Sequence, residues 1–482
     1  MIPMSDRKKL PRFLLVIYLL ALLVRLGPLV AAREMTIGLD DMFQYDMLAR
    51  SLAAGEGFRW YGEKDLALVE RYFPLDWIVD DYDPRGVLTS FRSPGYPFFL
   101  SLIYRVGGLD DRFFIARLVQ VLLMALMAPM TSLLALRLFP EKQSIARISG
   151  VVIALYPFLL VYPLALATEV TFLPLVLGAL LAVLRAGESH RWQDYLLAGA
   201  LLGAAALTRS VIVAILPLMM LWAWFMARDK KGALILLASV LVCTVPWSVR
   251  NSRLHGEFTF IENSMGYTLY MGYHPDTQGR FEFGPSVDLM PYLDDGVRNQ
   301  VGMEKAIGFI QAEPDRVPYL MLRKLGYFFG LERRALTYFY SNDFVGYLPQ
   351  PYLTLLFVFF CLPFVLLTLS SALVLPALTW KKDHWLVAGV FLGYLAPHLL
   401  LLAEPRFHLT LVPILAVFGA YGWVERRKVL AALDPRTNPW KLVLVLVVLG
   451  LLLFNWGFEL WSDADKLRLL FGPQGNQTYF SY

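Results

Sequence analysis

The sequence predicts an all-α protein that crosses a membrane many times. Of its 482 residues, 57% are hydrophobic and only 17% are charged, whereas a soluble domain usually carries about a quarter charged residues. The mean hydropathy is +0.53. About eleven apolar runs approach the roughly 20 residues that a helix needs to span a bilayer. This composition excludes a soluble enzyme, and the lack of low-complexity or heptad patterns excludes disordered, collagen-like and coiled-coil chains.

The first apolar run, from Phe13 to Ala32, follows a basic stretch at residues 7–12 and therefore resembles a signal peptide. It is longer than the usual apolar core of such a peptide, and many runs follow it, so we expect an uncleaved first helix. Two later runs, 170–185 and 194–208, are short for a span. The further expected spans are 112–138, 145–165, 210–227, 232–248, 351–379, 385–403, 407–424 and 441–459.

Basic residues in the short loops predict the orientation of these spans. With a cytoplasmic N-terminus, alternation places five basic loops on one side, as the positive-inside rule requires. These loops carry Arg137/Lys142/Arg147, Arg185/Arg191, Arg228/Lys230/Lys231, Lys381/Lys382 and Arg426/Arg427/Lys428. The net charge of +5 is thus explained by topology and indicates no nucleic acid partner. We expect a multi-pass protein of the cytoplasmic (inner) membrane.

Two long polar segments, 33–111 and 249–350, then fall on the outer side. The first contains a short amphipathic stretch, Ser93 to Gly108, which predicts a helix lying on the membrane surface. The second contains a helix-like stretch at 301–312. Long loops on a rigid helical scaffold suit a functional site. We expect one transmembrane domain over 1–459 that includes both loops, and a short outer tail over 460–482.

The segment directly after the first span reads DDMFQYDMLARSLAAGEGF, residues 40–58. Helical spacing puts Asp41, Tyr45 and Ala49 on one face, and Gly55 and Gly57 are suited to end the helix. Two interpretations of the acidic pair remain open. Asp40 or Asp41 is a good N-terminal helix cap. Alternatively, Asp41 is a catalytic carboxylate that faces a cavity covered by the outer loops.

This segment resembles the first outer loop of C-type glycosyltransferases, in the pattern Asp41-x-x-x-Tyr45-x-x-x-Ala49 followed by Leu52, Gly55, Gly57 and Phe58. The most similar branch is the superfamily of protein mannosyltransferases and aminoarabinose transferases. Five later segments are similar to family motifs: SPGYPFFLSLIYRVGG (93–108), LATEVTFLPLVL (166–177), LTRS (207–210), PWSVRN (246–251) and EPRFHLTLVPILAV (404–417). The resemblance extends from the first helix to about residue 425 and implies the GT-C fold.

The resemblance also implies roles for the acidic residues. These enzymes use sugars linked to a lipid phosphate, and an acceptor hydroxyl must lose its proton as it attacks the anomeric carbon. The resemblance makes Asp41 the general base, with Asp40 as the alternative because adjacent acids leave the register open. Glu169 becomes the second acidic residue of the site, which orients the acceptor or holds a cation. Tyr45 and Glu404 are expected in the substrate cavity.

Three arginines near outer helix junctions are candidates for the donor phosphate: Arg209, Arg250 and Arg406. A leaving phosphate needs cations nearby, and arginine suits bidentate phosphate contact. The alternative for each arginine is that it reaches the membrane interface or pairs with a nearby acid, as Arg406 could with Glu404.

A dedicated metal centre is not predicted, because no two of the outer histidines (His255, His274, His398 and His408) have the i, i+4 spacing of helical ligands. If a divalent cation takes part, Asp41 and Glu169 are its plausible oxygen ligands.

The chain shows no long polar stretch for a nucleotide-binding α/β domain, which favours a lipid-linked donor that arrives from the bilayer. Tyr338, Phe339, Tyr340 and Phe344 could line its access route. The sequence therefore predicts an inverting transferase that moves a hexose or pentose from a polyprenyl-phosphate-linked donor to a glycan, lipid or protein acceptor. Two alternatives are a transporter or flippase of a lipid-linked substrate, which predicts internal repeats and a midplane site, and a non-catalytic scaffold.

Overall fold

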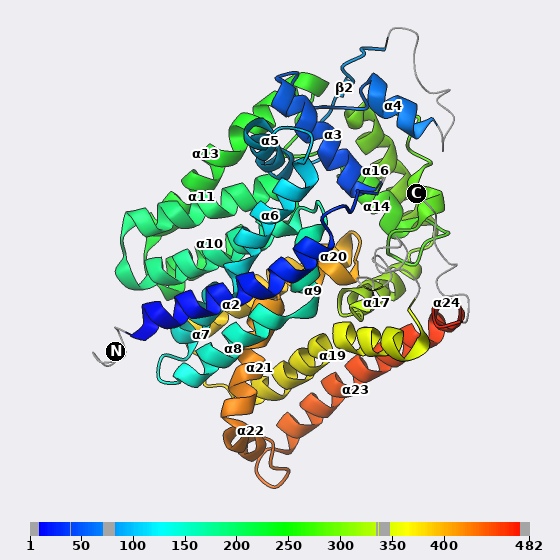
Figure 1. Cartoon of the computed structure of the whole chain (residues 1–482). Coiled ribbons are helices and arrows are strands. Elements are labelled where there is room, and N and C mark those ends of the chain that lie inside the picture. Colours follow the sequence, from blue (N-terminus) through cyan, green and yellow to red (C-terminus); the bar gives the residue numbers. More distant parts are fainter. Residues whose placement is uncertain (1–8, 39, 71–81, 334–335, 337–347, 473–482) are drawn as a thin grey trace.

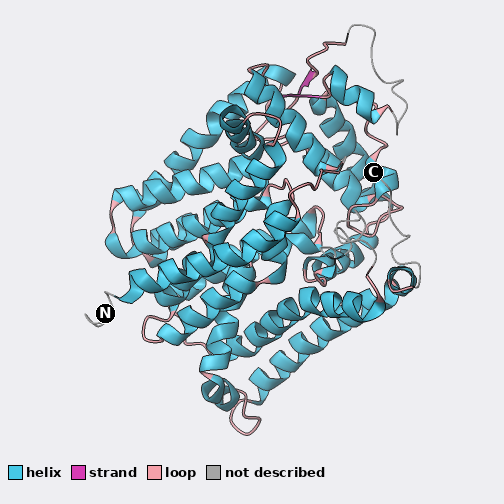
Figure 2. Ribbon diagram, in the orientation of Figure 1, coloured by secondary structure: helices cyan, strands magenta, loops and turns pink. Residues whose placement is uncertain are grey.

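The computed structural model describes residues 9–38, 40–70, 82–333, 336 and 348–472, and these are almost entirely helical (Figure 2). Two short strands, β1 (Arg59–Trp60) and β2 (Val87–Leu88), pair antiparallel in the first outer segment. The four aromatic residues expected along the access route, Tyr338, Phe339, Tyr340 and Phe344, lie outside the described residues.

The elements fall into two groups along the chain. The bundle consists of α2 (Lys9–Ala31), α6 (Arg112–Ala125), α7 (Met127–Leu138), α8 (Gln143–Leu155), α9 (Pro157–Val161), η1 (Tyr162–Leu164), α10 (Glu169–Ser189), α11 (Trp192–Thr208), η2 (Ser210–Ile215), α12 (Leu216–Leu221), the π-helical η3 (Trp222–Met226), α13 (Lys230–His255), α19 (Gln350–Val374), η4 (Leu375–Ala377), α20 (Lys382–Leu400), η5 (Pro405–Thr410), α21 (Val412–Val424), α22 (Arg426–Ala432) and α23 (Pro439–Ser462). The two long segments predicted to lie outside, 33–111 and 249–350, and the tail add α3 (Asp41–Ala54), α4 (Glu63–Val69), α5 (Gly95–Gly107), α14 (Met265–Tyr273), α15 (Phe283–Ser286), α16 (Asp295–Ala312), α17 (Arg316–Phe328) and α24 (Ala464–Leu470).

Within the described part of the chain, 6 helices are long and apolar enough to cross a membrane, or up to 7 if one bent pair is a single span. They are α2, the continuous α6–α7, α10, α13, α19 with η4, and α23. The bent pair is α8 with α9 and η1, which turns by 54° where Tyr156 takes an extended conformation before Pro157. The prediction of a multi-span membrane protein is confirmed, but the count of eleven spans is not.

Helix length accounts for part of the difference in count. The run at 194–208 becomes α11, which has only 17 residues, and the run at 407–424 divides into η5 and the 13-residue α21. In contrast, the short run at 170–185 extends at both ends into the 21-residue α10. The apolar window of α10 is 78% buried, against 11% for that of α23. The helix with the shorter apolar run is therefore the central one, packed against α7 and α11.

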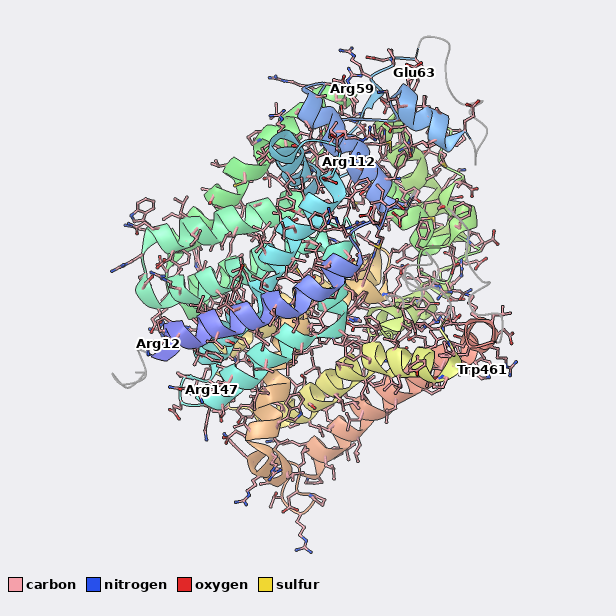
Figure 3. All side chains as sticks on the ribbon, viewed as in Figure 1. Arg12, Arg59, Glu63, Arg112, Arg147 and Trp461 are labelled. Carbon is pink, nitrogen blue, oxygen red and sulfur yellow. The ribbon has the colours of Figure 1, made fainter. Side chains whose placement is uncertain are left out.

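The five basic loops lie together at one end of the bundle. Figure 3 labels Arg12 and Arg147 at this end, and Arg59 and Glu63 at the other. Four contacts connect the loops: Arg137 with Asp383 (2.9 Å), Lys142 with Glu425 (2.7 Å), Lys382 with the carbonyl of Gly187 (3.1 Å) and His190 with Asp229 (3.3 Å). Helices α3, α4, α14 and α16 of the segments predicted to lie outside, called the outer helices below, gather at the opposite end (Figure 1).

The predicted surface helix forms as α5. Its buried face carries Tyr96, Leu100 and Tyr104, whereas Phe98 and Val106 are exposed, so the helix is amphipathic as expected. Its first residue, Gly95, lies against the end of α11, where an added Cβ would approach the Leu207 carbonyl oxygen to 2.8 Å. This close approach brings the chain just before α5 next to the chain just after α11.

Candidate active site

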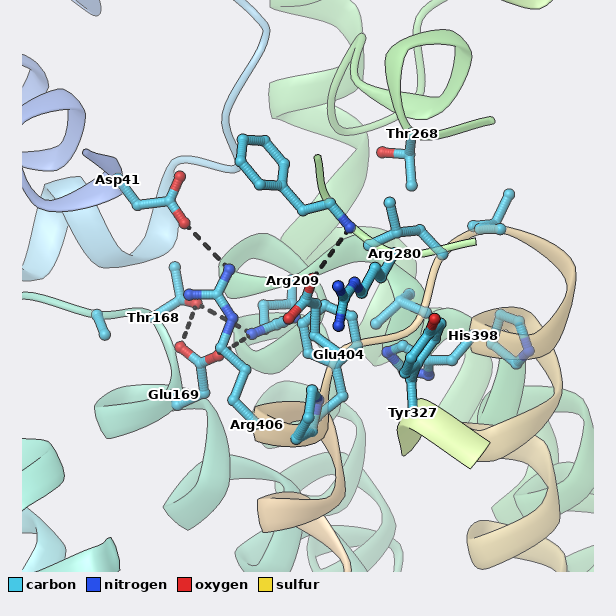
Figure 4. A pocket seen from close by; sticks show the side chains of 18 of the residues that line it. Asp41, Thr168, Glu169, Arg209, Thr268, Arg280, Tyr327, His398, Glu404 and Arg406 are labelled. Atoms are coloured by element: carbon cyan, nitrogen blue, oxygen red, sulfur yellow. Dashed lines mark hydrogen bonds and ion pairs between the residues drawn. The ribbon is translucent and has the colours of Figure 1, made fainter. Parts of the chain in front are cut away.

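A cavity of about 2350 Å³ lies between the outer helices and the bundle. Its outer part is lined by charged residues at the start of α3, the start of α10 and the η5 turn (Figure 4). Its inner part is lined by apolar side chains of α19, α20, α21 and α23, among them Val387, Phe391, Leu415, Phe418, Val448 and Leu452. One continuous space therefore joins a charged end to an apolar groove.

Asp41 is the first residue of α3, and its carboxylate faces the cavity. The neighbouring Asp40 fills the cap position, where its Oδ1 accepts a hydrogen bond from the Met42 backbone N–H at 2.8 Å. Asp40 is thus the helix cap, whereas Asp41 faces the cavity and its catalytic role stays a prediction. Asp41 Oδ1 accepts from Arg92 Nη2 at 2.5 Å, and its Oδ2 accepts from Arg406 Nη2 at 3.2 Å.

Glu169 is the first residue of α10 and is only 3% exposed. Its Oε1 accepts a hydrogen bond from Arg209 Nη1 at 2.5 Å, and its Oε2 accepts from the Thr168 hydroxyl at 3.1 Å (Figure 4). A carboxylate at a helix N-terminus is stabilised by the helix dipole. Buried carboxylates are otherwise costly, so the Arg209 partner and the helix end together keep this group ionised.

Arg406 lies between the two acids. Its Nη2 donates to Asp41, and its Nε is 4.0 Å from Glu169 Oε1. The Nε atom is buried and has no hydrogen-bond partner among the described residues. Pro405 begins the η5 turn that carries Arg406. Glu404, the residue before this turn, accepts a hydrogen bond from the Phe281 N–H at 3.0 Å.

Burial and the charges around the two adjacent aspartates shift their pKa values in opposite directions. Burial alone would raise the pKa of Asp41, but the charges of Arg92 and Arg406 outweigh it and hold that pKa well below its usual range. Burial raises the pKa of Asp40 to about 6, and the negative charge of Asp41 adds to this shift. Near neutral pH, Asp41 is therefore fully ionised, whereas Asp40 titrates close to that range.

Arg92 is a site residue that the sequence analysis missed. Besides Asp41 it contacts Gln44, with Nε to Oε1 at 2.9 Å, and its guanidinium lies 5.5 Å from the centroid of the Tyr45 ring. Tyr45 itself is buried and packs edge-on against Tyr96 at 5.2 Å. The position of Arg92 in the sequence could have indicated it, because Arg92 directly precedes Ser93-Pro94, the start of the motif at 93–108.

The structure brings most of the predicted site residues together but leaves one apart. Asp40, Asp41, Tyr45, Glu169, Arg209, Glu404 and Arg406 all line the cavity. Arg250 is not among the lining residues. Its Nη1 donates to the Thr89 carbonyl at 2.6 Å and to Asn251 Oδ1 at 2.8 Å, and its guanidinium stacks over Trp247. Arg250 thus fastens the strand β2 segment to α13.

Arg280 and Arg323 form a second cationic group in the cavity, around the Tyr327 ring. Their guanidinium carbons lie 5.2 and 4.9 Å from the ring centroid. Arg280 pairs with Glu282 at 2.8 Å. Arg323 donates to the Tyr327 hydroxyl, and its buried Nε has no hydrogen-bond partner in the part of the chain that the structure describes. In Figure 4 Arg280 lies beside Glu404, between the Arg406 site and Tyr327. Neither arginine was predicted from the sequence.

Asp41 and Glu169 do not fit a resident divalent cation. Among the described residues, no group of three or more His, Cys, Asp or Glu side chains is placed to hold a metal. Asp41 and Glu169 each accept from an arginine, with Arg406 between them, so a cation there would face three guanidinium groups. His398 and His408 contact the backbone carbonyls of Tyr394 and Phe328, each at 2.7 Å.

Comparisons with known proteins agree with this architecture. Residues 92–249 match the family model of dolichyl-phosphate-mannose-protein mannosyltransferases. No curated protein matches the sequence. Three similar solved structures are the apo oligosaccharyltransferase of Archaeoglobus fulgidus (TM-score 0.50, 14% identity, 98% of this chain and 61% of that chain), the same archaeal enzyme with an inhibitory peptide and a dolichol-phosphate (0.50, 14%, 100% and 62%), and ArnT from Cupriavidus metallidurans bound to undecaprenyl phosphate (0.39, 16%, 82% and 77%).

The fold and the site thus define a multi-pass membrane protein with the GT-C fold of C-type glycosyltransferases. The chain spans about three fifths of the length of the archaeal oligosaccharyltransferase. The family match, over residues 92–249, shows that this part of the chain is similar to the dolichyl-phosphate-mannose-protein mannosyltransferases, in agreement with the resemblance of the motifs.

Proposed function

We propose that this protein transfers a sugar from a polyprenyl-phosphate-linked donor to an acceptor hydroxyl at the outer face of a cytoplasmic membrane. The observation that carries the proposal is the single cavity that joins the Asp41–Arg406–Glu169 cluster to an apolar groove. Such a space suits a ligand with a charged head and a long hydrocarbon chain. The dolichol-phosphate in the archaeal oligosaccharyltransferase is a ligand of this type.

In this proposal the polyprenyl chain lies in the groove between α19, α20, α21 and α23. The donor phosphate then meets the arginines at the charged end of the cavity. Arg406 is the main candidate because no described residue accepts a hydrogen bond from its Nε. Arg280 lines the same cavity beyond Glu404, and Arg209 is engaged by Glu169 (Figure 4). Planar guanidinium groups bind phosphate oxygens bidentately and stabilise the charge that develops as the phosphate leaves.

Asp41 is the proposed general base. The acceptor oxygen bonds to the anomeric carbon, the carbon–oxygen bond to phosphate breaks with its electron pair leaving on the phosphate, and the hydroxyl proton passes to the carboxylate. A single displacement of this kind inverts the anomeric configuration. Glu169 would orient the acceptor, and Asp40 is the alternative base, although its carboxylate caps α3.

The arginine contacts imply how such a base becomes active. In the present geometry Asp41 is a weak base because Arg92 and Arg406 stabilise its ionised form. A donor phosphate gives Arg406 a further anionic partner besides Asp41 and Glu169. When the guanidinium shifts toward the phosphate, its hold on Asp41 weakens, and the carboxylate gains proton affinity as the leaving group gains its cation.

The experiment has two stages. Lipids extracted with the purified protein are identified by mass spectrometry, and the matching lipid-linked sugar is then used as donor in liposomes. We expect the Asp41→Asn variant to lose about 10²- to 10⁴-fold in kcat while remaining folded under the assay conditions. Glu304→Gln, an exposed acid on α16, is the matched control. Normal turnover by Asp41→Asn would exclude it as base, and lipid transport without any glycoside product would favour a flippase.

A further inference from the structure

Glu262 lies in the outer segment between α13 and α14 and lines the cavity. Its two carboxylate oxygens accept hydrogen bonds from two serines that are distant in the sequence. Ser93 Oγ donates to Oε2 at 2.5 Å, and Ser210 Oγ donates to Oε1 at 2.6 Å. One carboxylate therefore joins the chain before α5 to the chain after α11.

Each of these serines directly follows an arginine of the site. Arg92, before Ser93, holds Asp41 at 2.5 Å. Arg209, before Ser210, holds Glu169 at 2.5 Å. The carboxylate of Glu262 is thus one hydrogen bond and one peptide unit away from both acid–arginine pairs.

The backbone on both sides of Glu262 is itself fastened. The Ile261 carbonyl accepts from Trp247 Nε1 at 3.0 Å and from Asn251 Nδ2 at 2.8 Å, both on α13. The Asn263 N–H donates to the Ser90 carbonyl at 2.9 Å. The carboxylate is therefore presented from a fixed backbone, which is what a brace between two other segments requires.

We propose that Glu262 is a positioning residue that sets the spacing between the Asp41–Arg92 and Glu169–Arg209 pairs. It does so through Ser93 and Ser210 and touches no substrate. The two acids act on one acceptor and one anomeric carbon, and a displacement of about 1 Å in such a geometry can reduce the rate about 100-fold. The inference rests on the proposed function for its effect on rate, but the brace itself is a property of the fold.

The choice of residue supports a brace rather than simple packing. Glutamate presents two acceptor oxygens, so both serine hydroxyls can donate to it at once. A glutamine offers one acceptor oxygen and one amino group, so one of the two serines has to rotate and accept instead. An alanine removes both contacts. A graded series, wild type, Glu262→Gln and Glu262→Ala, therefore follows from the geometry.

The kinetic test measures kcat and donor KM for this series with the lipid-linked donor. We expect kcat to fall about 3- to 10-fold in Glu262→Gln and about 30- to 100-fold in Glu262→Ala, while donor KM changes less than about 3-fold. The Ser93→Ala/Ser210→Ala double variant should reproduce the loss in Glu262→Ala, and adding Glu262→Ala to it should cost no more than about 2-fold further. Glu304→Gln is the control.

A second measurement needs no substrate. Unfolding midpoints of Glu262→Ala, Ser93→Ala, Ser210→Ala and their combinations form double-mutant cycles that report coupling between these side chains. Additive midpoints would show that the brace does not exist and would overturn the inference. Coupled midpoints with an unchanged kcat in Glu262→Ala would overturn the positioning role. If the wild-type protein transfers no sugar while the midpoints are coupled, the proposed function fails and the brace stands.

Discussion

Asp41 and Arg406 are separated by 365 positions in the chain, yet Asp41 Oδ2 and Arg406 Nη2 lie 3.2 Å apart. Asp41 starts the first helix after the first span, and Arg406 lies in the turn before α21. The same arginine reaches toward Glu169 at 4.0 Å. The charged end of the cavity is therefore assembled from the beginning, middle and end of the chain, and its three parts are held together by ion pairs across the site.

Arg406 is expected to contribute mainly to donor use. Arg406→Lys keeps the charge but loses the planar fork, so donor KM should rise about tenfold. Arg406→Gln removes the cation that faces the leaving phosphate, so kcat/KM should fall about 10²- to 10³-fold. The measurement is steady-state transfer with Arg253→Gln, an exposed arginine of α13, as control. Unchanged donor kinetics in Arg406→Gln would exclude the phosphate contact.

Asp40 is expected to reduce stability above pH 6. Its pKa in the folded state is about 6, above the ordinary value of 3.8. Between these two pH values the folded state therefore binds more protons than the unfolded state. The free energy of unfolding consequently falls as the pH rises from about 4 to about 6. Asparagine is an equally good helix cap. Asp40→Asn should therefore raise the free energy of unfolding by roughly 2–3 kcal/mol at pH 8 and by almost nothing near pH 4.

The check is unfolding in detergent across pH 4 to 8, with Glu304→Gln as control. A gain in stability that is the same at both ends of this range would contradict the pKa of Asp40. A loss at every pH would mean that the Asp40 carboxylate makes a contact that asparagine cannot replace.

Hydropathy and local motifs predicted the parts of this protein that depend on neighbouring residues. The helix starting at Asp41, its end at Gly55 with φ of +80°, and the amphipathic α5 all form as expected. Contacts between distant segments were not predictable in this way. Arg92 has no local feature that marks it as the partner of Asp41, and Arg250 looks as suitable for phosphate as Arg406 until the fold directs it to the Thr89 carbonyl. The count of eleven spans is likewise not confirmed, because α11 and α21 are shorter than the usual length of a span.

Arg250 is expected to affect stability rather than donor binding. Arg250→Ala leaves the Thr89 carbonyl without its arginine donor, and the free energy of unfolding should fall by about 1–3 kcal/mol. Donor KM in the folded protein should stay within about twofold of the wild type. A tenfold rise in donor KM with unchanged stability would restore the phosphate-binding role that the sequence suggested for this residue.

The apolar groove is expected to distinguish donors by the length of their lipid chain. Leu452 lines the cavity from α23, whereas Leu444 on the same helix is 61% exposed and does not line it. A tryptophan at 452 would fill part of the space assigned to the polyprenyl chain, so Leu452→Trp should raise KM about tenfold for a long-chain donor. It should have little effect on a donor with two isoprene units, whose chain ends before the obstruction. Leu444→Trp, which adds the same bulk on the outer surface of α23, should change neither value. Equal effects of Leu452→Trp on both donors would mean that the chain does not lie in this groove, and the proposed route of the donor from the bilayer to Arg406 would have to be abandoned.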